Sequence, residues 1–197
     1  MKPERSGLGA ARDEKEPRTR GGRIAGTEMF KIFFAFFAPL RLYSMGKESE
    51  IMDGKPDIAI ACDHAGVEMK INLVKYLLKR GHNVIDMGVR RKTRVDYPDY
   101  GKKVAEAVAR GEVPLGILIC GTGIGMCIVA NRYKGVRAAV VHDHYTTRVA
   151  KSHNDANILC LGARVIAKEL AEELVETWLT TEFEGGRHQH RIDKIDR

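Results

Sequence analysis

Five short apolar runs alternate with segments of helical periodicity between residues 57 and 180 of this 197-residue chain. The runs have the length of strands: Ile58–Cys62, Asn83–Asp86, Leu115–Cys120, Val136–Val141 and Asn157–Leu161. Helical spacing of apolar residues follows each run, in Val67–Arg80, Tyr100–Ala109, Met126–Asn131, a stretch ending near Ser152, and Ala167–Leu179. Such alternation with short connections is typical of a parallel sheet covered on both faces. The sequence therefore predicts an α/β fold with a Rossmann-like, open five-stranded parallel sheet in three α/β/α layers.

A glycine-rich turn follows the third run, where Cys120 is succeeded by Gly121-Thr122-Gly123-Ile124-Gly125. Alternate glycines allow a sharp turn whose N–H groups point into one concavity, and the next helix adds its positive N-terminal end. An oxyanion would be stabilised there, and so would a thiolate of Cys120. The alternative is a purely structural turn beside a small core cysteine. This stretch alone leaves both interpretations open.

Polar residues follow the other strands as well. Because open parallel sheets bind ligands beyond the carboxyl ends of their strands, we expect one edge to collect Asp63, His64, Cys120, His142 and Asp143. Asp63 could simply cap the following helix. His153 and Asn154 precede the fifth strand, so they should lie at the opposite edge unless a second chain brings them back.

Two polar clusters allow two interpretations each. Ser152–Asn157 consists of common turn formers, or it presents His153 as a proton shuttle. Gly185–Arg191 is a solvated basic tail, or it places Arg187 and Arg191 on one helical turn as a phosphate clamp. No metal site is expected, since the sequence has neither an HExxH motif nor a Cys/His quartet.

Charge and cysteine usage exclude several classes of protein. The net charge of +7 comes from basic residues interleaved with acids, so a phosphorylated small molecule explains them without nucleic acid. The four cysteines form no CxxC pair, which favours reduced thiols in a cytoplasmic protein. No run reaches the ~20 apolar residues of a membrane span.

The first 55 residues differ from the rest and are expected to form an extension to a single domain at 56–197. Met1–Arg23 is rich in charge and glycine and should be disordered. Phe30–Leu40 is apolar and aromatic; it suggests a signal-peptide core, an amphipathic segment, or a start assigned upstream of Met45 or Met52. We assign this extension no function.

Six motifs in this order resemble one family, the type B ribose-5-phosphate isomerases of the RpiB/LacAB group of sugar-phosphate isomerases. They are Cys62–Gly66 (CDHAG), Asp96–Tyr100 (DYPDY), Gly116–Gly125 (GILICGTGIG), Ala130–Arg132 (ANR), Ser152–Asn157 (SHNDAN) and Glu184–Arg191 (EGGRHQHR). The resemblance covers about Asp57 to Asp196, and residues 1–50 have no counterpart.

The resemblance implies an aldose–ketose isomerase that interconverts ribose 5-phosphate and ribulose 5-phosphate through a cis-enediolate, without metal or cofactor. This reaction belongs to the non-oxidative pentose phosphate pathway. Cys120 would be the base, and Thr122 with the backbone N–H groups of Gly121, Gly123, Ile124 and Gly125 would hold the enediolate oxygens. Some relatives have a carboxylate where this chain has Met126, which cannot act as a base. Cys127 is expected in the core.

The remaining site residues are implied in the same way. His153 would assist opening of the furanose ring with Asn154 beside it, while Asp63 and Tyr97 would bind the sugar. The phosphate would be bound by His64, Arg164, Arg187 and Arg191, with His188 close by. In the family each site is shared between two subunits, which predicts a homodimer and leaves tetramers open.

Two alternatives remain at this point. Galactose 6-phosphate or allose 6-phosphate could be the substrate, since the loop Val89–Arg94 would set the length of the pocket. A dinucleotide-binding module is the alternative of another class, because Gly121-x-Gly-x-Gly followed by Asp143 imitates a nucleotide fingerprint. The spacing is GxGxG rather than GxGxxG, and the turn follows the third strand.

Overall fold

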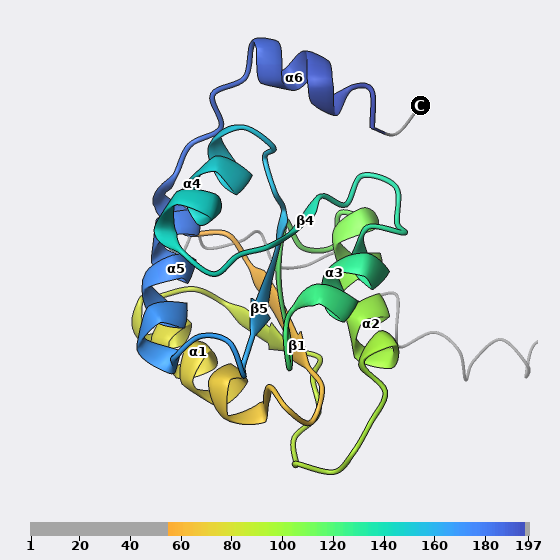
Figure 1. The fold of residues 1–197 in the computed structure, drawn as a ribbon, viewed down its shortest axis with the longest axis vertical. Coiled ribbons are helices and arrows are strands. Elements are labelled where there is room, and N and C mark those ends of the chain that lie inside the picture. The colour runs from red at the N-terminus through yellow and green to blue at the C-terminus, as the bar shows by residue number, and fades with distance from the viewer. Residues whose placement is uncertain (1–54, 196–197) are drawn as a thin grey trace, which may run out of the picture. The chain divides into compact units, whose positions relative to one another are not determined.

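The computed structural model describes residues 55–195 (Figure 1). Its strands are β1 Ile58–Cys62, β2 Val84–Asp86, β3 Leu115–Cys120, β4 Ala138–Val140 and β5 Ile158–Gly162. Its helices are α1 Val67–Lys79, α2 Tyr97–Ala109, α3 Ile124–Ala130, α4 His144–Ser152, α5 Lys168–Thr180 and α6 Arg187–Ile192. The predictions for Met1–Arg23 and Phe30–Leu40 lie outside the described residues.

All five strands form one parallel sheet in the order β2-β1-β3-β5-β4, which confirms the predicted fold class. Helices α1, α4 and α5 cover one face, and α2 and α3 cover the other (Figure 1). Alternate residues of a strand point to opposite faces of the sheet. Ile58 and Ile60 pack toward α1 and α5, whereas Ala59 and Ala61 pack toward α2 and α3. The apolar runs are continuous because both faces are buried.

The path of the chain indicates where a ligand would bind this sheet. From β1 the chain passes through α1 to the edge strand β2, then returns across the opposite face through α2 to β3. Strand β3 pairs with the other side of β1, so the strand order reverses between these two strands. In open α/β sheets ligands bind beyond the carboxyl ends of the strands at such a reversal.

Three element boundaries differ from the sequence prediction by two residues or more. Helix α2 begins at Tyr97 rather than Tyr100, because Pro98 suits the first helical turn, where its missing N–H costs nothing. Helix α3 begins at Ile124 rather than Met126, because Gly123 adopts the left-handed conformation (φ +80°) that starts it. Strand β4 is Ala138–Val140, shorter than predicted. Within residues 55–195 no helix is long and apolar enough to cross a membrane.

Candidate active site

The turn after β3 brings a backbone N–H group to the sulfur of Cys120. The Gly123 N–H donates a hydrogen bond to Cys120 Sγ across 3.1 Å. Cys120 is 5% exposed, and the left-handed conformation of Gly123 is what turns its N–H toward the sulfur. An N–H aimed at the sulfur stabilises negative charge there, so this geometry suits a thiolate.

Two further predicted residues border the same turn. A Cβ atom added to Gly125 would lie 2.7 Å from the ring of Tyr97, so the ring of Tyr97 packs directly against the glycine backbone. Arg164 follows β5, and its backbone N–H donates to the carbonyl oxygen of Gly121 across 3.0 Å. The Arg164 guanidinium is also close, 3.5 Å from the position of a Cβ on Gly121. The turn therefore has a cation near its first glycine and an aromatic ring near its last glycine.

Asp63 and His64 lie beyond the neighbouring strand β1. The carboxylate of Asp63 is buried and accepts hydrogen bonds from the N–H groups of Ala65 (2.8 Å) and Gly66 (3.3 Å), so it organises the turn before α1. His64 Nδ1 lies 3.3 Å from the carbonyl oxygen of Val95. That contact ties His64 to the segment that leads into Tyr97.

The carboxyl edge of the sheet thus brings together the first half of the predicted site. Its members are Asp63, His64, Tyr97, Cys120, Gly121, Thr122, Gly123, Ile124, Gly125 and Arg164. His142 and Asp143 follow β4 at this edge as expected. The carboxylate of Asp143 accepts a hydrogen bond from Thr146 N–H and caps α4. This contact holds the pKa of Asp143 below its usual value.

The second half of the predicted site lies at the opposite edge. Helix α4 starts beyond the carboxyl end of β4 and ends before β5, so the residues that follow it, His153 and Asn154, lie at the amino edge. Helix α6 adds Arg187, His188 and Arg191. The rings of His153 and His188 stack, with centroids 4.2 Å apart and planes 9° apart. One chain therefore does not bring His153 to Cys120.

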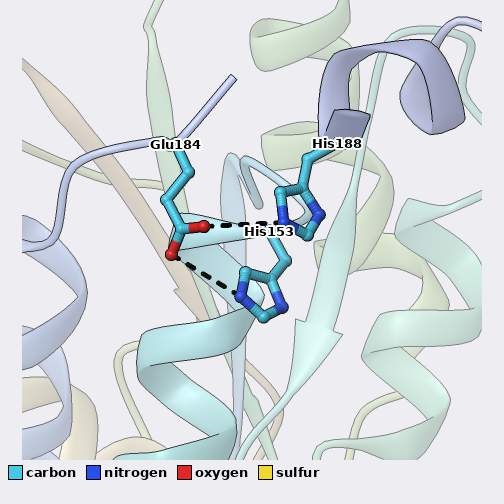
Figure 2. Close-up of side chains that lie close together, drawn as sticks. All are labelled: His153, Glu184 and His188. Atoms are coloured by element: carbon cyan, nitrogen blue, oxygen red, sulfur yellow. Dashed lines mark ion pairs between the residues drawn. The ribbon is translucent and has the colours of Figure 1, made fainter. Parts of the chain in front are cut away.

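A carboxylate that the sequence analysis missed lies between these two histidines. Glu184 Oε1 is 3.6 Å from His153 Nε2, and Glu184 Oε2 is 3.5 Å from His188 Nε2 (Figure 2). Desolvation lowers the pKa of His188, with His153 and Arg187 acting in the same direction and Glu184 opposing them. Glu184 is part of the EGGRH motif, but its role shows only once the chain is folded.

Among the described residues, His153, Glu184 and His188 are also the one set with ligand atoms close enough to suggest a metal ion. These atoms lie within 4.8 Å of one another, but Nε2 of His188 already accepts a hydrogen bond from Arg187 Nε across 3.3 Å, so its lone pair is occupied. The two ring planes are only 9° apart, so the lone pairs in these planes do not converge on one point between the rings. The arrangement fits a carboxylate that shares a proton with an imidazole ring better than it fits metal coordination.

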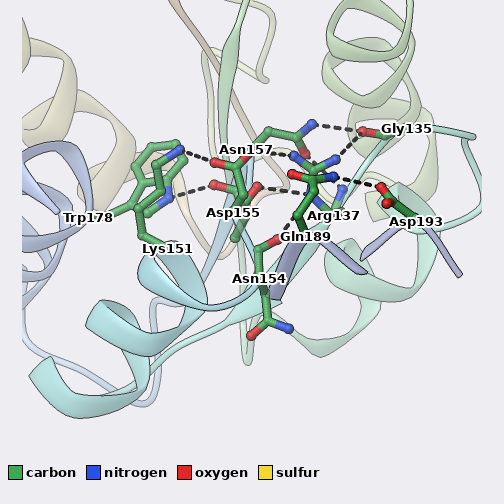
Figure 3. A network of polar contacts seen from close by, with 10 residues as sticks. Gly135, Arg137, Lys151, Asn154, Asp155, Asn157, Trp178, Gln189 and Asp193 are labelled. Carbon is green, nitrogen blue, oxygen red and sulfur yellow. Dashed lines mark hydrogen bonds and ion pairs between the residues drawn. The ribbon is translucent and has the colours of Figure 1, made fainter. Parts of the chain in front are cut away.

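A polar network fixes the segment that carries His153 and Asn154 (Figure 3). Arg137 Nε donates to the carbonyl oxygens of Asn154 and Asp155, each at 3.0 Å, and Arg137 Nη2 pairs with the Asp155 carboxylate at 2.7 Å. Lys151 donates to the same carboxylate across 2.6 Å. Asp155 has a φ of +43°, a left-handed conformation that this network stabilises.

We expect Arg137→Ala to lower the free energy of unfolding by about 1–3 kcal/mol, because it leaves two carbonyl groups without this donor and leaves the Asp155 carboxylate paired with Lys151 alone. Urea denaturation measures the loss. Arg110→Ala is the matched control: Arg110 pairs with Glu112 on the surface, where ion pairs contribute about 0–1 kcal/mol. Equal losses in the two variants would show that the Arg137 network does not stabilise the segment.

Comparisons of this sequence with a family model and with known proteins point to the same family. Residues 58–195 match the model of the family described as Ribose/Galactose Isomerase. Ribose-5-phosphate isomerase B of Escherichia coli is 49% identical over 138 residues, which span 70% of this chain and 93% of that protein.

Solved structures agree with this match. The crystal structure of a ribose 5-phosphate isomerase from Thermotoga maritima superposes with a TM-score of 0.71 at 51% identity, covering 73% of this chain and 99% of that one. The Mycoplasma genitalium ribose-5-phosphate isomerase B, solved with bound ribulose 5-phosphate, gives a TM-score of 0.70 at 43% identity, covering 72% and 94%. The chain belongs to the ribose/galactose isomerase family.

Proposed function

We propose that this protein is an aldose–ketose isomerase that interconverts D-ribose 5-phosphate and D-ribulose 5-phosphate. The observation that carries the proposal is the hydrogen bond from Gly123 N–H to the buried sulfur of Cys120, at the point where the strand order reverses. Relatives at 43–51% identity that are named as ribose-5-phosphate isomerases, one of them holding ribulose 5-phosphate, support this substrate.

The proposed chemistry is a proton transfer between neighbouring carbons. The Cys120 thiolate removes the proton from C2 of the open-chain aldose and returns it to C1, which gives the ketose. Negative charge develops on the sugar oxygens in the cis-enediolate between these steps. The N–H groups of the turn from Gly121 to Gly125, with the Thr122 hydroxyl, stabilise that charge.

Before that step the furanose ring must open, and the phosphate must be bound. We assign ring opening to His153 with Asn154 beside it, and binding of the sugar to Asp63 and Tyr97. The phosphate is assigned to His64, Arg164, Arg187 and Arg191, with His188 close by. Guanidinium groups suit this task because their paired N–H donors match phosphate oxygens.

Since His153 and Cys120 lie at opposite edges of one chain, we propose a homodimer in which each site draws on both subunits. Exposed apolar side chains support such an interface: Ile124 (54%) and Ile128 (52%) share one face of α3, and Tyr145 (65%) lies on α4. A groove along the outer strand β4 is lined by Val136, Ala138, Ala139 and Ile195. Strand β4 is at the edge of the sheet, and edge strands are a surface that natural proteins tend to cover.

We also propose that the enzyme works in the cytoplasm. The cysteines Cys62, Cys120, Cys127 and Cys160 are all free thiols, as is usual in a reducing compartment such as the cytoplasm.

A direct assay tests the function. Purified protein incubated with ribose 5-phosphate should form ribulose 5-phosphate at a kcat within the usual range of about 1–1000 per second. Galactose 6-phosphate and allose 6-phosphate, assayed in parallel, should show a much lower kcat/KM. A preference for either six-carbon substrate would contradict the proposed substrate, and no turnover of any of the three would contradict the enzyme class.

A further inference from the structure

Glu184 is held in place by its backbone as well as by its side chain. Its N–H donates to the carbonyl oxygen of Ser152, the last residue of α4, across 2.9 Å. This bond fixes the segment after α5 directly beside His153, the next residue after Ser152. The carboxylate then extends between the edges of two stacked imidazole rings (Figure 2). It is therefore a fixed part of the histidine cluster.

The two histidines differ in their ability to share a proton with Glu184. Arg187 Nε donates a hydrogen bond to His188 Nε2 across 3.3 Å, so this nitrogen of His188 carries a lone pair. Burial and the neighbouring cations also favour the neutral form of His188. A nitrogen that accepts from Arg187 cannot also donate to the carboxylate. Of the two histidines, only His153 can therefore donate a proton from Nε2 to the Glu184 carboxylate.

We propose that Glu184 is a positioning residue for ring opening: it holds a proton on Nε2 of His153, while His188 fixes the plane of that ring by stacking. The inference rests on the proposed function, in which His153 acts on the furanose. Nδ1 of His153 lies on the side of the ring away from Glu184 (Figure 2), where it can face a sugar. The partner of one imidazole nitrogen determines whether the other is an acceptor.

The step that Glu184 supports is opening of the furanose ring, in which His153 moves one proton from the anomeric hydroxyl to O4. Nδ1 of His153 takes the proton of the anomeric hydroxyl while the C1–O4 bond breaks and a C1 carbonyl forms. The resulting imidazolium then gives that proton to O4. The Glu184 carboxylate stabilises the imidazolium between these transfers, as the carboxylate of a catalytic triad does for its histidine.

Ribulose 5-phosphate allows ring opening to be separated from proton transfer. Its phosphate blocks the oxygen that would close a furanose, so this ketose reaches the enzyme already open. In deuterium oxide, Cys120 exchanges a C1 proton of ribulose 5-phosphate through the enediolate without any ring chemistry, and proton NMR follows that exchange. Net conversion of ribose 5-phosphate needs both steps.

The test is Glu184→Gln, which keeps the size of the side chain and removes its charge. We expect kcat for ribose 5-phosphate to fall by about tenfold to a hundredfold, since general acid–base groups contribute about 100-fold or more. Solvent exchange at C1 of ribulose 5-phosphate should stay within about threefold of wild type, because the Cys120 step is untouched. Glu182→Gln, an exposed carboxylate on the same segment, is the control and should leave both rates unchanged.

Three other outcomes would overturn the inference. A parallel fall of isomerisation and exchange in Glu184→Gln would mean that Glu184 only supports the structure, and unchanged isomerisation would mean that it has no role; either result overturns the inference. Loss of activity in the wild-type enzyme on treatment with a chelator would also overturn it, in favour of a bound metal. Failure of the proposed function is distinguishable, because wild type would then turn over neither sugar phosphate.

Discussion

Replacing Cys120 with alanine should lower kcat for ribose 5-phosphate by about a thousandfold or more, the usual effect of removing a catalytic base. The turn offers no substitute, since Met126 carries a thioether that cannot accept a proton. Binding should persist, because the groups assigned to the sugar and phosphate are unchanged. Isothermal titration calorimetry should therefore give a Kd for ribose 5-phosphate within about threefold of wild type while turnover is lost.

Cys127 provides a stringent control for this result. A hydrogen bond from the Cys160 thiol lowers the pKa of Cys127 to about 7, so acidity alone would make Cys127 a candidate base. Its location argues against that role, because Cys127 Sγ contacts the carbonyl oxygen of Ala138 at 3.2 Å and thus faces β4. Cys127→Ala should retain kcat within about threefold. If Cys127→Ala were inactive and Cys120→Ala active, the base would be Cys127 and the assignment to Cys120 would be wrong.

The fold was predictable because its pattern is local. Each strand buries both faces, so runs such as Ile58–Cys62 are continuously apolar, and each helix repeats apolar residues every three or four positions. The starts of α2 and α3 were displaced by two or three residues. They depend on how Pro98 and Gly123 fit a helix start, which periodicity does not describe.

The candidate site was predictable only in part. Residues at or just after the ends of strands, such as Cys120 and Asp63, could be placed at one edge because topology alone determines their position. Glu184 and Arg137 were missed because their partners are distant in sequence: Glu184 lies beside His153, and Arg137 contacts Asp155. Isolated charged residues of this kind look like ordinary surface positions until the segments between them have folded.

Cys120 and His153 lie at opposite edges of the sheet, and this placement predicts a second large effect, on the activity of mixed dimers. If Cys120 of one subunit works with His153 of its partner, Cys120→Ala and His153→Ala homodimers should each lose about 99% of their activity or more. A mixed dimer of the two variants contains one site with both substitutions and one site with neither. Random pairing gives mixed dimers as half of the total, so about a quarter of wild-type activity should return.

Activity of the co-expressed variants, compared with each variant alone and with wild type, tests the shared site most directly. Mixing Cys120→Ala with the double variant Cys120→Ala/His153→Ala serves as the control, since no pairing of these chains restores a complete site. We predict recovery to about a quarter of wild-type activity in the first mixture and none in the control. No recovery in mixed dimers isolated by two different affinity tags would show that each chain builds its own site, and would contradict this account.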